Sequence, residues 1–189
     1  KVYGANNRVY TIVGDGESEE GQVWEACMFA AHYKLDNLCV IIDWNGLQID
    51  GPVAEGMNPT PLDKKFEAFG FNVISIDAHD FDEIEAAFDD ARTVKGKPTA
   101  IIARSVKGKG VSYMENACEW HGQAPKEDLY KVAVEELEKI GFDGIKMLEG
   151  KPTLHKKIGK NLLNDEHDKF FAEAEKRGTH ILFHVNDPA

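Results

Sequence analysis

Three features are scarce in this chain of 189 residues, and each scarcity narrows what the protein can be. There are only three cysteines, widely spaced and without a CxxC pair, so we expect a reduced, cytoplasmic protein. No apolar run approaches the ~18 residues that span a membrane, and the start of the chain, KVYGANN, lacks the apolar core of a signal peptide. Positive charge is also scarce. With 22 Lys and Arg against 33 Asp and Glu, the net charge of −11 argues against a nucleic-acid partner.

What the sequence does contain is an alternation of strand and helix patterns. Hydrophobic residues make up 42% of the chain, which is typical of a globular domain. Four short runs rich in β-branched residues are almost continuously apolar, as expected for strands buried on both faces of a parallel sheet. These runs are Val9–Val13, Leu38–Ile42, Asn72–Ile76 and Thr99–Ala103.

Helical patterns lie between these runs and after the last one. They cover residues 19–35, 80–94 and 126–140, and the second pattern places Phe81, Ile84, Ala87 and Phe88 on one face. Strands that alternate with helices predict an α/β domain, a doubly wound and mostly parallel sheet with helices on both faces.

Two irregular segments and a change of sequence pattern near residue 142 complete the organisation of the chain. Residues 46–63 contain three prolines and three glycines, which predicts a long, functional loop. A second irregular stretch runs from 107 to about 125. We expect a domain over residues 1–141 and a C-terminal extension of open role over 142–189, with a helix near 165–177 and a strand near 179–185.

Oxygen-bearing side chains follow two of the predicted strands. The glycine loop GDGESEEG, which contains Asp15, follows the first strand, and DWNGLQIDG, which contains Asn45, follows the second. Adjacent parallel strands would bring Asp15 and Asn45 to one edge, where ligands bind in open α/β sheets. Carboxylate and amide oxygens suit Mg²⁺ or Ca²⁺. A metal could therefore stand between Asp15 and a diphosphate, with glycine N–H groups and a helix N-terminus taking the other oxygens. The alternative is that Asp15 caps the following helix and the glycines only make a turn.

Other phosphate and metal motifs are missing, and a second group of polar residues is present. The chain has no GxxxxGK[ST] loop, no GxGxxG at this turn and no EF-hand spacing from Asp15 onward. After the strand that ends near Ala103 come KGKG, with Lys107 and Lys109, and WHGQAP, with His121. Those side chains could face an anion, although a solvated turn and a structural histidine are the alternatives. The other histidines, His79 among them, have no motif around them.

These elements, taken in order, resemble the transketolase branch of the thiamine diphosphate enzymes. The match rests on GDG…N, EG…E, IDG, KGKG and WHGQAP, and it runs from about Val9 to Leu137. The resemblance implies that Mg²⁺ (with Ca²⁺ as a substitute) and thiamine diphosphate bind here. It implies that Asp15 and Asn45 ligate the metal by their side chains and Leu47 by its carbonyl. Gly16 would donate its N–H to the diphosphate, Gly14 would permit the turn, and Ile49 would pack on the cofactor. His121 would contact the diphosphate and the substrate, Lys107 would lie near the cofactor, and Glu20 and Glu25 would lie at a subunit interface.

The resemblance also implies a reaction and a partner. Transketolases move a two-carbon ketol unit from a ketose phosphate to an aldose phosphate, which would place the chain in the pentose phosphate pathway. Few residues precede the first strand, and no pyrimidine-binding domain with an activating glutamate is recognised. We therefore expect a subunit or fragment that is inactive alone and works in a homo- or hetero-oligomer. The alternatives are a deoxyxylulose phosphate synthase-like or 2-oxo acid dehydrogenase-like enzyme, and a non-catalytic Mg²⁺-diphosphate binding module.

Overall fold

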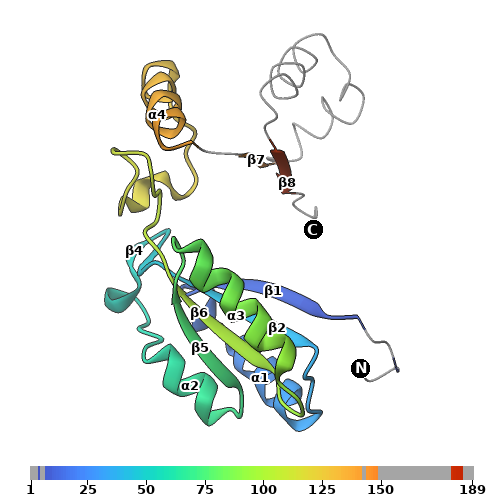
Figure 1. Cartoon of the computed structure of the whole chain (residues 1–189). Coiled ribbons are helices and arrows are strands. Elements are labelled where there is room, and N and C mark those ends of the chain that lie inside the picture. Colours follow the sequence, from blue (N-terminus) through green and yellow to red (C-terminus); the bar gives the residue numbers. More distant parts are fainter. Residues whose placement is uncertain (1–3, 5–6, 142–143, 149–179, 185–189) are drawn as a thin grey trace, which may run out of the picture. The chain divides into compact units, whose positions relative to one another are not determined.

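The structure of the chain is a computed structural model that describes residues 4, 7–141, 144–148 and 180–184 (Figure 1). It divides into two compact units, residues 1–133 and residues 134–189, which we describe separately. Among the described residues, no helix is both long and apolar enough to cross a membrane.

The first unit is built on a four-stranded parallel sheet in the order β1-β2-β6-β5. All four predicted strands are confirmed. They are β1 (Val9–Gly14), β2 (Leu38–Trp44), β5 (Asn72–Asp77) and β6 (Thr99–Arg104). Because every strand runs in the same direction, their carboxyl ends form one edge of the sheet, and β1 and β2 are neighbours there.

Helices cover both faces of this sheet, which confirms the doubly wound α/β architecture. On one face, α1 (Gly21–His32) and α2 (Leu62–Ala68) pack Cys27, Ala30, Leu62 and Phe66 against Val40, Ile42, Ala100 and Ile102 of the strands. On the other, α3 (Phe81–Thr93) packs Ala87 and Ala91 against Cys39, Ile76, Ile101 and Ala103. Figure 1 shows α3 in front of the sheet and α1 behind it.

The prediction that all four strands are buried on both faces is wrong for β1. Val9, Tyr10 and Ile12 are 46%, 44% and 73% exposed. In the described structure β1 is an edge strand that pairs only with β2, and α3 packs chiefly on the β5 side of the sheet. A hollow of about 300 Å³ remains beside β1, with Ile12, Ile41 and Phe88 in its lining.

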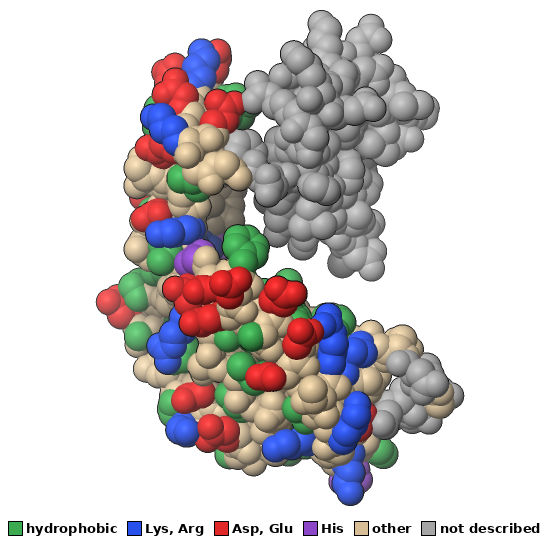
Figure 2. Space-filling model, in the orientation of Figure 1, with side chains coloured by type: hydrophobic (Ala, Val, Ile, Leu, Met, Phe, Trp, Pro, Cys, Tyr) green, Lys and Arg blue, Asp and Glu red, His purple; other side chains and the backbone are tan. Residues whose placement is uncertain are grey.

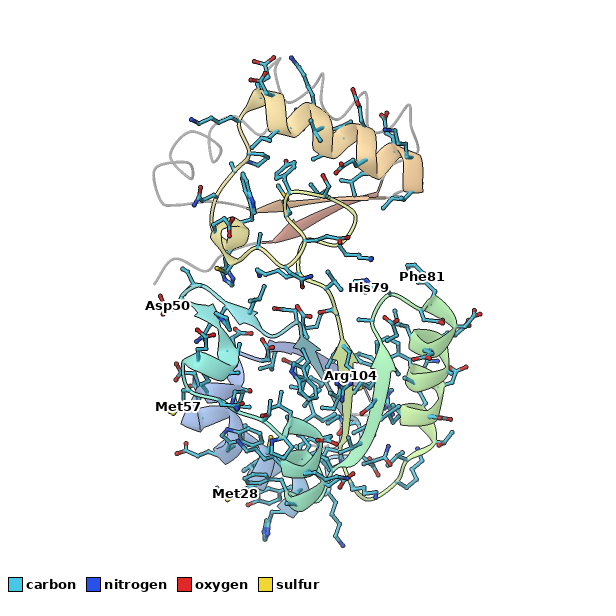
Figure 3. All side chains as sticks on the ribbon, turned by 90° about the vertical axis from the view of Figure 1, so that its left-hand side faces the viewer. Met28, Asp50, Met57, His79, Phe81 and Arg104 are labelled. Carbon is cyan, nitrogen blue, oxygen red and sulfur yellow. The ribbon has the colours of Figure 1, made fainter. Side chains whose placement is uncertain are left out.

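The third helix, α3, is held at its start by Asp80, whose side chain accepts the main-chain N–H groups of Asp82 and Glu83. Its predicted apolar face is only partly correct, because Phe81 is 84% exposed at the beginning of the helix (Figure 3). Acidic side chains gather on the exposed face of α3 (Figure 2).

The predicted long loop over residues 46–63 contains more structure than its composition suggested. A short hairpin joins β3 (Leu47–Gln48) to β4 (Gly51–Pro52), with Ile49 and Asp50 at its turn. A 3₁₀ turn, η2 (Val53–Glu55), follows, and α2 begins at Leu62. The sequence pattern did not predict α2, a helix of seven residues that is anchored by the fully buried Leu62 and Phe66.

The remaining described elements are η3, α4 and a pair of strands. The 3₁₀ turn η3 (Cys118–His121) lies in the second irregular stretch, and α4 (Glu127–Ile140) matches the third predicted helix. In the second unit, β7 (Gly144–Leu148) pairs in parallel with β8 (His180–His184). The strand predicted near residues 179–185 is therefore confirmed, β7 was not predicted, and the helix expected near 165–177 lies outside the described residues.

The contrast between β1 and β2 can be tested with one substitution made in both strands. We expect Ile42→Ala to lower the free energy of unfolding by about 2–5 kcal/mol, because the side chain of Ile42 is 0% exposed. Ile12→Ala should cost less than about 1 kcal/mol, since the side chain of Ile12 is 73% exposed. Urea unfolding of both variants measures the difference, and equal losses would contradict the exposed position of β1.

Candidate metal and diphosphate site

The site is built around Asp15, the residue that directly follows β1. Its side chain is 1% exposed, and both of its carboxylate oxygens accept hydrogen bonds from main-chain N–H groups. Oδ1 accepts from Gly16 at 2.9 Å, and Oδ2 accepts from Gly46, in the turn after β2, at 2.6 Å. The main-chain N–H of Asp15 in turn donates to the carbonyl of Asp43 at 3.1 Å. The carboxylate thus joins the ends of β1 and β2, at the sheet edge where the sequence predicted that Asp15 and Asn45 would meet.

The alternative role of Asp15 as a helix cap is not what the structure shows. The residue before the 3₁₀ turn η1 (Glu17–Glu19) is Gly16, and the residue before α1 is Glu20. Neither position carries a side-chain capping bond. The carboxylate of Asp15 is directed instead across the sheet edge to the neighbouring turn.

The electrostatic setting of Asp15 favours a bound cation. Burial raises the pKa of this carboxyl above its usual value, and the charge of Asp43 adds to that rise, whereas the N–H groups of Gly46 and Gly16 oppose it. In the described part of the chain, no lysine or arginine forms an ion pair with Asp15. A divalent cation would provide the opposite charge that this buried carboxylate lacks.

Asn45 and Leu47, the other two predicted metal ligands, lie in the same turn after β2. The amide nitrogen of Asn45 donates to Oδ2 of Asp43 at 3.1 Å, and its amide oxygen accepts the N–H of Leu47 at 3.0 Å. A carboxylate, an amide oxygen and a main-chain carbonyl are hard donors, and each oxygen can accept more than one partner. The three predicted metal ligands therefore fit Mg²⁺ in their chemistry.

The glycine loop is narrow where the diphosphate is predicted to lie. A Cβ atom on Gly16 would lie 2.8 Å from Oε1 and 2.9 Å from Cβ of Gln48, so the backbone approaches β3 closely. The N–H of Gly16 donates to Asp15 in this structure. The N–H of Gly14 donates to Oε2 of Glu17 at 2.7 Å, so a second carboxylate of this acidic loop accepts a hydrogen bond from the main chain. Part of the loop's negative charge thus holds the loop itself in shape.

The KGKG segment forms a tight loop at the end of β6. The carbonyl of the partly buried Lys107 accepts the N–H of Asn116 at 2.9 Å, and the N–H of Gly110 donates to Glu115 at 3.0 Å. Gly108 has a φ of +73°, and a Cβ atom there would lie 2.4 Å from the carbonyl oxygen of Met114. Only glycine fits that position, so the loop that carries Lys107 has a fixed shape.

No sequence motif indicated a role for His79, which lies at the carboxyl edge of the sheet in the structure. Nε2 of His79 accepts the N–H of Val106 at 2.8 Å and so holds the start of the KGKG loop to the end of β5. Figure 3 shows His79 and Asp50 at the same end of the sheet. The only sequence signal was the position of His79 just after a predicted strand.

The other predicted site residues lie on the surface of the first unit. Ile49, at the turn of the β3–β4 hairpin, is 68% exposed. His121 is exposed at the end of η3, which lies beside β3. Glu20 is exposed just before α1, and Glu25 is exposed on the same face of α1 as Met28 and Phe29. No side-chain hydrogen bond joins Ile49, His121, Glu20 or Glu25 to the Asp15 turn in the described structure, so their roles stay predictions.

The fold agrees with what comparison with known proteins shows. Residues 4–175 match the family described as the transketolase, thiamine diphosphate binding domain, and the chain belongs to that family. The match extends beyond the residues 9–137 on which the sequence motifs rested.

Several relatives of the chain are named as subunits of transketolases. The chain is 48% identical over 136 residues to the 6-deoxy-6-sulfo-D-fructose transketolase subunit SqwG of Clostridium sp. (strain MSTE9), covering 71% of this chain and 49% of that protein. It is 42% identical over 140 residues to one subunit of the apulose-4-phosphate transketolase of Actinobacillus succinogenes, covering 73% of this chain and 50% of that subunit. The chain thus spans about half the length of these curated relatives.

A solved structure gives the same fold. The transketolase of Campylobacter jejuni superposes with a TM-score of 0.66 at 33% identity, over 90% of this chain and 27% of that one.

Two glycines with the same backbone conformation offer a test of the fixed KGKG loop. Gly108 and Gly96 have φ values of +73° and +74°, but of these two only Gly108 would have a Cβ atom within 4 Å of another atom. We expect Gly96→Ala to destabilise the protein by about 1 kcal/mol through its left-handed backbone alone. Gly108→Ala should cost clearly more in the same urea titration because it adds a clash with main chain. Equal losses in the free energy of unfolding would show that the KGKG loop can shift to accommodate the added Cβ atom.

Proposed function

We propose that this chain is the Mg²⁺- and thiamine diphosphate-binding part of a transketolase, a transferase that moves a two-carbon ketol unit from a ketose phosphate to an aldose phosphate. One observation carries the proposal. A buried carboxylate with a raised pKa, that of Asp15, is fixed to the turn that holds Asn45 and Leu47, at the joined ends of two parallel strands. Membership of the transketolase family supports the choice of cofactor.

The residues of this turn have distinct tasks in the proposed site. Asp15 and Asn45 would hold Mg²⁺, or Ca²⁺ in its place, by their side-chain oxygens, and Leu47 would hold it by its carbonyl. Gly16, whose main-chain N–H donates to Asp15 in the structure, would donate it to the diphosphate, and the exposed Ile49 would pack against the cofactor. When bound, thiamine diphosphate supplies the nucleophilic carbon that takes up the ketol unit.

His121 and Lys107 are the proposed catalytic residues of this chain. The exposed imidazole of His121 can donate hydrogen bonds to diphosphate and substrate oxygens, and an imidazole can act as a general acid or base. Lys107 sits on a loop whose main chain Gly108 holds in one shape, so its flexible side chain would reach an anion from a fixed starting point.

The proposed activity requires a partner that contributes a pyrimidine-binding subunit or domain with an activating glutamate. The chain covers about half of relatives that are themselves named as subunits, which supports a second chain. The outer face of α1 supports an interface, because Met28, Phe29 and Tyr33 are 55%, 51% and 51% exposed next to Glu25. We therefore propose a homo- or hetero-oligomer in which Glu20 and Glu25 lie near the partner.

The setting of the reaction belongs to the same proposal. All three cysteines are free, two of them buried, which suits a reducing cytoplasm. A ketose phosphate and an aldose phosphate as substrates would place the protein in the pentose phosphate pathway. The acidic surface gives no support for binding nucleic acid.

The proposed role of Asp15 as a metal ligand is tested by making the same Asp→Asn substitution at Asp15 and at an exposed control position. We expect Asp15→Asn, which keeps the side-chain volume and one acceptor, to weaken Mg²⁺-dependent binding of thiamine diphosphate at least about tenfold, because the ligand's charge is lost. Asp90→Asn, on the exposed face of α3, should bind as the wild type does. Calorimetry on the chain alone and with a co-purifying partner measures both variants. Normal affinity in Asp15→Asn would remove Asp15 from the site, and no binding by the folded wild type in either setting would contradict the proposed function.

The role of His121 is tested in the reconstituted enzyme. We expect His121→Ala to lower kcat by about 10²-fold or more through loss of proton handling, while the melting temperature stays the same because the side chain is exposed. Glu119→Ala, an exposed neighbour in η3, is the control for damage to this turn. Unchanged turnover in His121→Ala would leave that histidine with a structural role only.

A further inference from the structure

Asp43 is a charged residue at the sheet edge for which the motif comparison provides no role. It lies in β2 and pairs in register with Gly14 of β1 on one side and with Ala103 of β6 on the other. Its carboxylate accepts two side-chain hydrogen bonds, from the hydroxyl of Ser105 to Oδ1 and from the amide nitrogen of Asn45 to Oδ2 at 3.1 Å. Asp43 therefore connects the end of β6 to the turn that carries the proposed ligands.

The side chain of Asn45 can satisfy its neighbours in only one orientation. An amide group has nearly the same shape when it is rotated by about 180°, but this rotation exchanges the donor NH₂ group and the acceptor oxygen. One end of this amide faces the carboxylate of Asp43, which accepts only, and the other faces the main-chain N–H of Leu47, which donates only. The nitrogen must therefore face Asp43, and the oxygen faces the main-chain N–H of Leu47, with room on the same oxygen for a second partner.

We propose that Asp43 is a positioning residue for the cation site, because it fixes the amide of Asn45 with its oxygen available to the metal. The inference deepens the proposed function and rests on it. Without Asp43, only the N–H of Leu47 would oppose an amide that turns over and presents its NH₂ group, which cannot ligate a cation. Partners behind a metal ligand commonly act in this way, by fixing the orientation of the ligating group.

Ser105 holds Asp43 in turn. Ser105 directly follows β6, its hydroxyl bonds to the Asp43 carboxylate, and its main-chain N–H donates to the carbonyl of Trp44 at 3.2 Å. The carboxylate is thus restrained from β6 as well as from its own strand. The chain of contacts runs from Ser105 through Asp43 to Asn45.

The negative charge of Asp43 could also attract a cation, so the test must separate charge from orientation. Asp43→Ala removes both the charge and the acceptor. Asp43→Asn removes the charge but keeps an oxygen for the Asn45 nitrogen, while its own NH₂ group can donate to the hydroxyl of Ser105. Rescue by the asparagine variant therefore identifies a positioning role.

Two readouts on the full chain test this without using enzyme activity. The first is the affinity for Mn²⁺ in the presence of inorganic diphosphate, measured by electron paramagnetic resonance. The second is the side-chain amide signal of Asn45 in a ¹⁵N NMR spectrum recorded without metal and assigned with Asn45→Asp. Ser75→Ala is the control for Ser105→Ala, because it makes the same substitution at an exposed serine of β5.

We expect Asp43→Ala to shift the Asn45 amide signals and to weaken Mn²⁺ binding about 10- to 100-fold. Asp43→Asn should retain most of the wild-type affinity, and Ser105→Ala should fall between the two. Equal losses in the alanine and asparagine variants would show that charge alone matters and would overturn the inference, as would unchanged amide signals in Asp43→Ala. If the wild type binds no Mn²⁺ with diphosphate, the proposed function fails, and the NMR result still decides whether Asp43 orients Asn45.

Discussion

The short hydrogen bond from the N–H of Gly46 to the buried carboxylate of Asp15 is the contact on which the site depends. It joins the ends of two neighbouring strands, so it can form only if β1 and β2 are adjacent and parallel. A buried carboxylate needs hydrogen bonds and an opposite charge. Main-chain donors provide the first, and the second is what makes this turn suitable for a divalent cation.

The rest of the sheet edge is connected to this contact by polar side chains that cross between strand ends. Asp43 joins β2 to Ser105 after β6, and His79 joins the end of β5 to Val106. Each of the four strand ends therefore bonds to a neighbour through side chain or main chain. Rigid strands that are joined in this way would keep the proposed ligands in place before a cofactor binds, which would lower the cost of ordering them on binding.

Two surfaces of the described structure leave apolar side chains in contact with solvent. The strand β1 exposes Ile12 on the α3 side of the sheet, and α1 exposes Met28 and Phe29 on the face that carries Glu25. Exposed apolar area of this kind is a feature of surfaces that are covered by other protein. It agrees with a chain that spans about half of its named relatives.

The sequence by itself determined the four strands, the α/β class and the position of Asp15 and Asn45 after two neighbouring strands, because hydrophobic period and motif order are local properties. It could not show α2, since Leu62 and Phe66 lie in a proline- and glycine-rich segment and are helical through burial. Nor could it show the exposure of β1 or the contacts of Asp43 with Ser105 and of His79 with Val106. Those depend on the strand order β1-β2-β6-β5, which brings together Asp43 and Ser105 although they are 62 positions apart, and only the packing of the sheet decides which distant strands become neighbours.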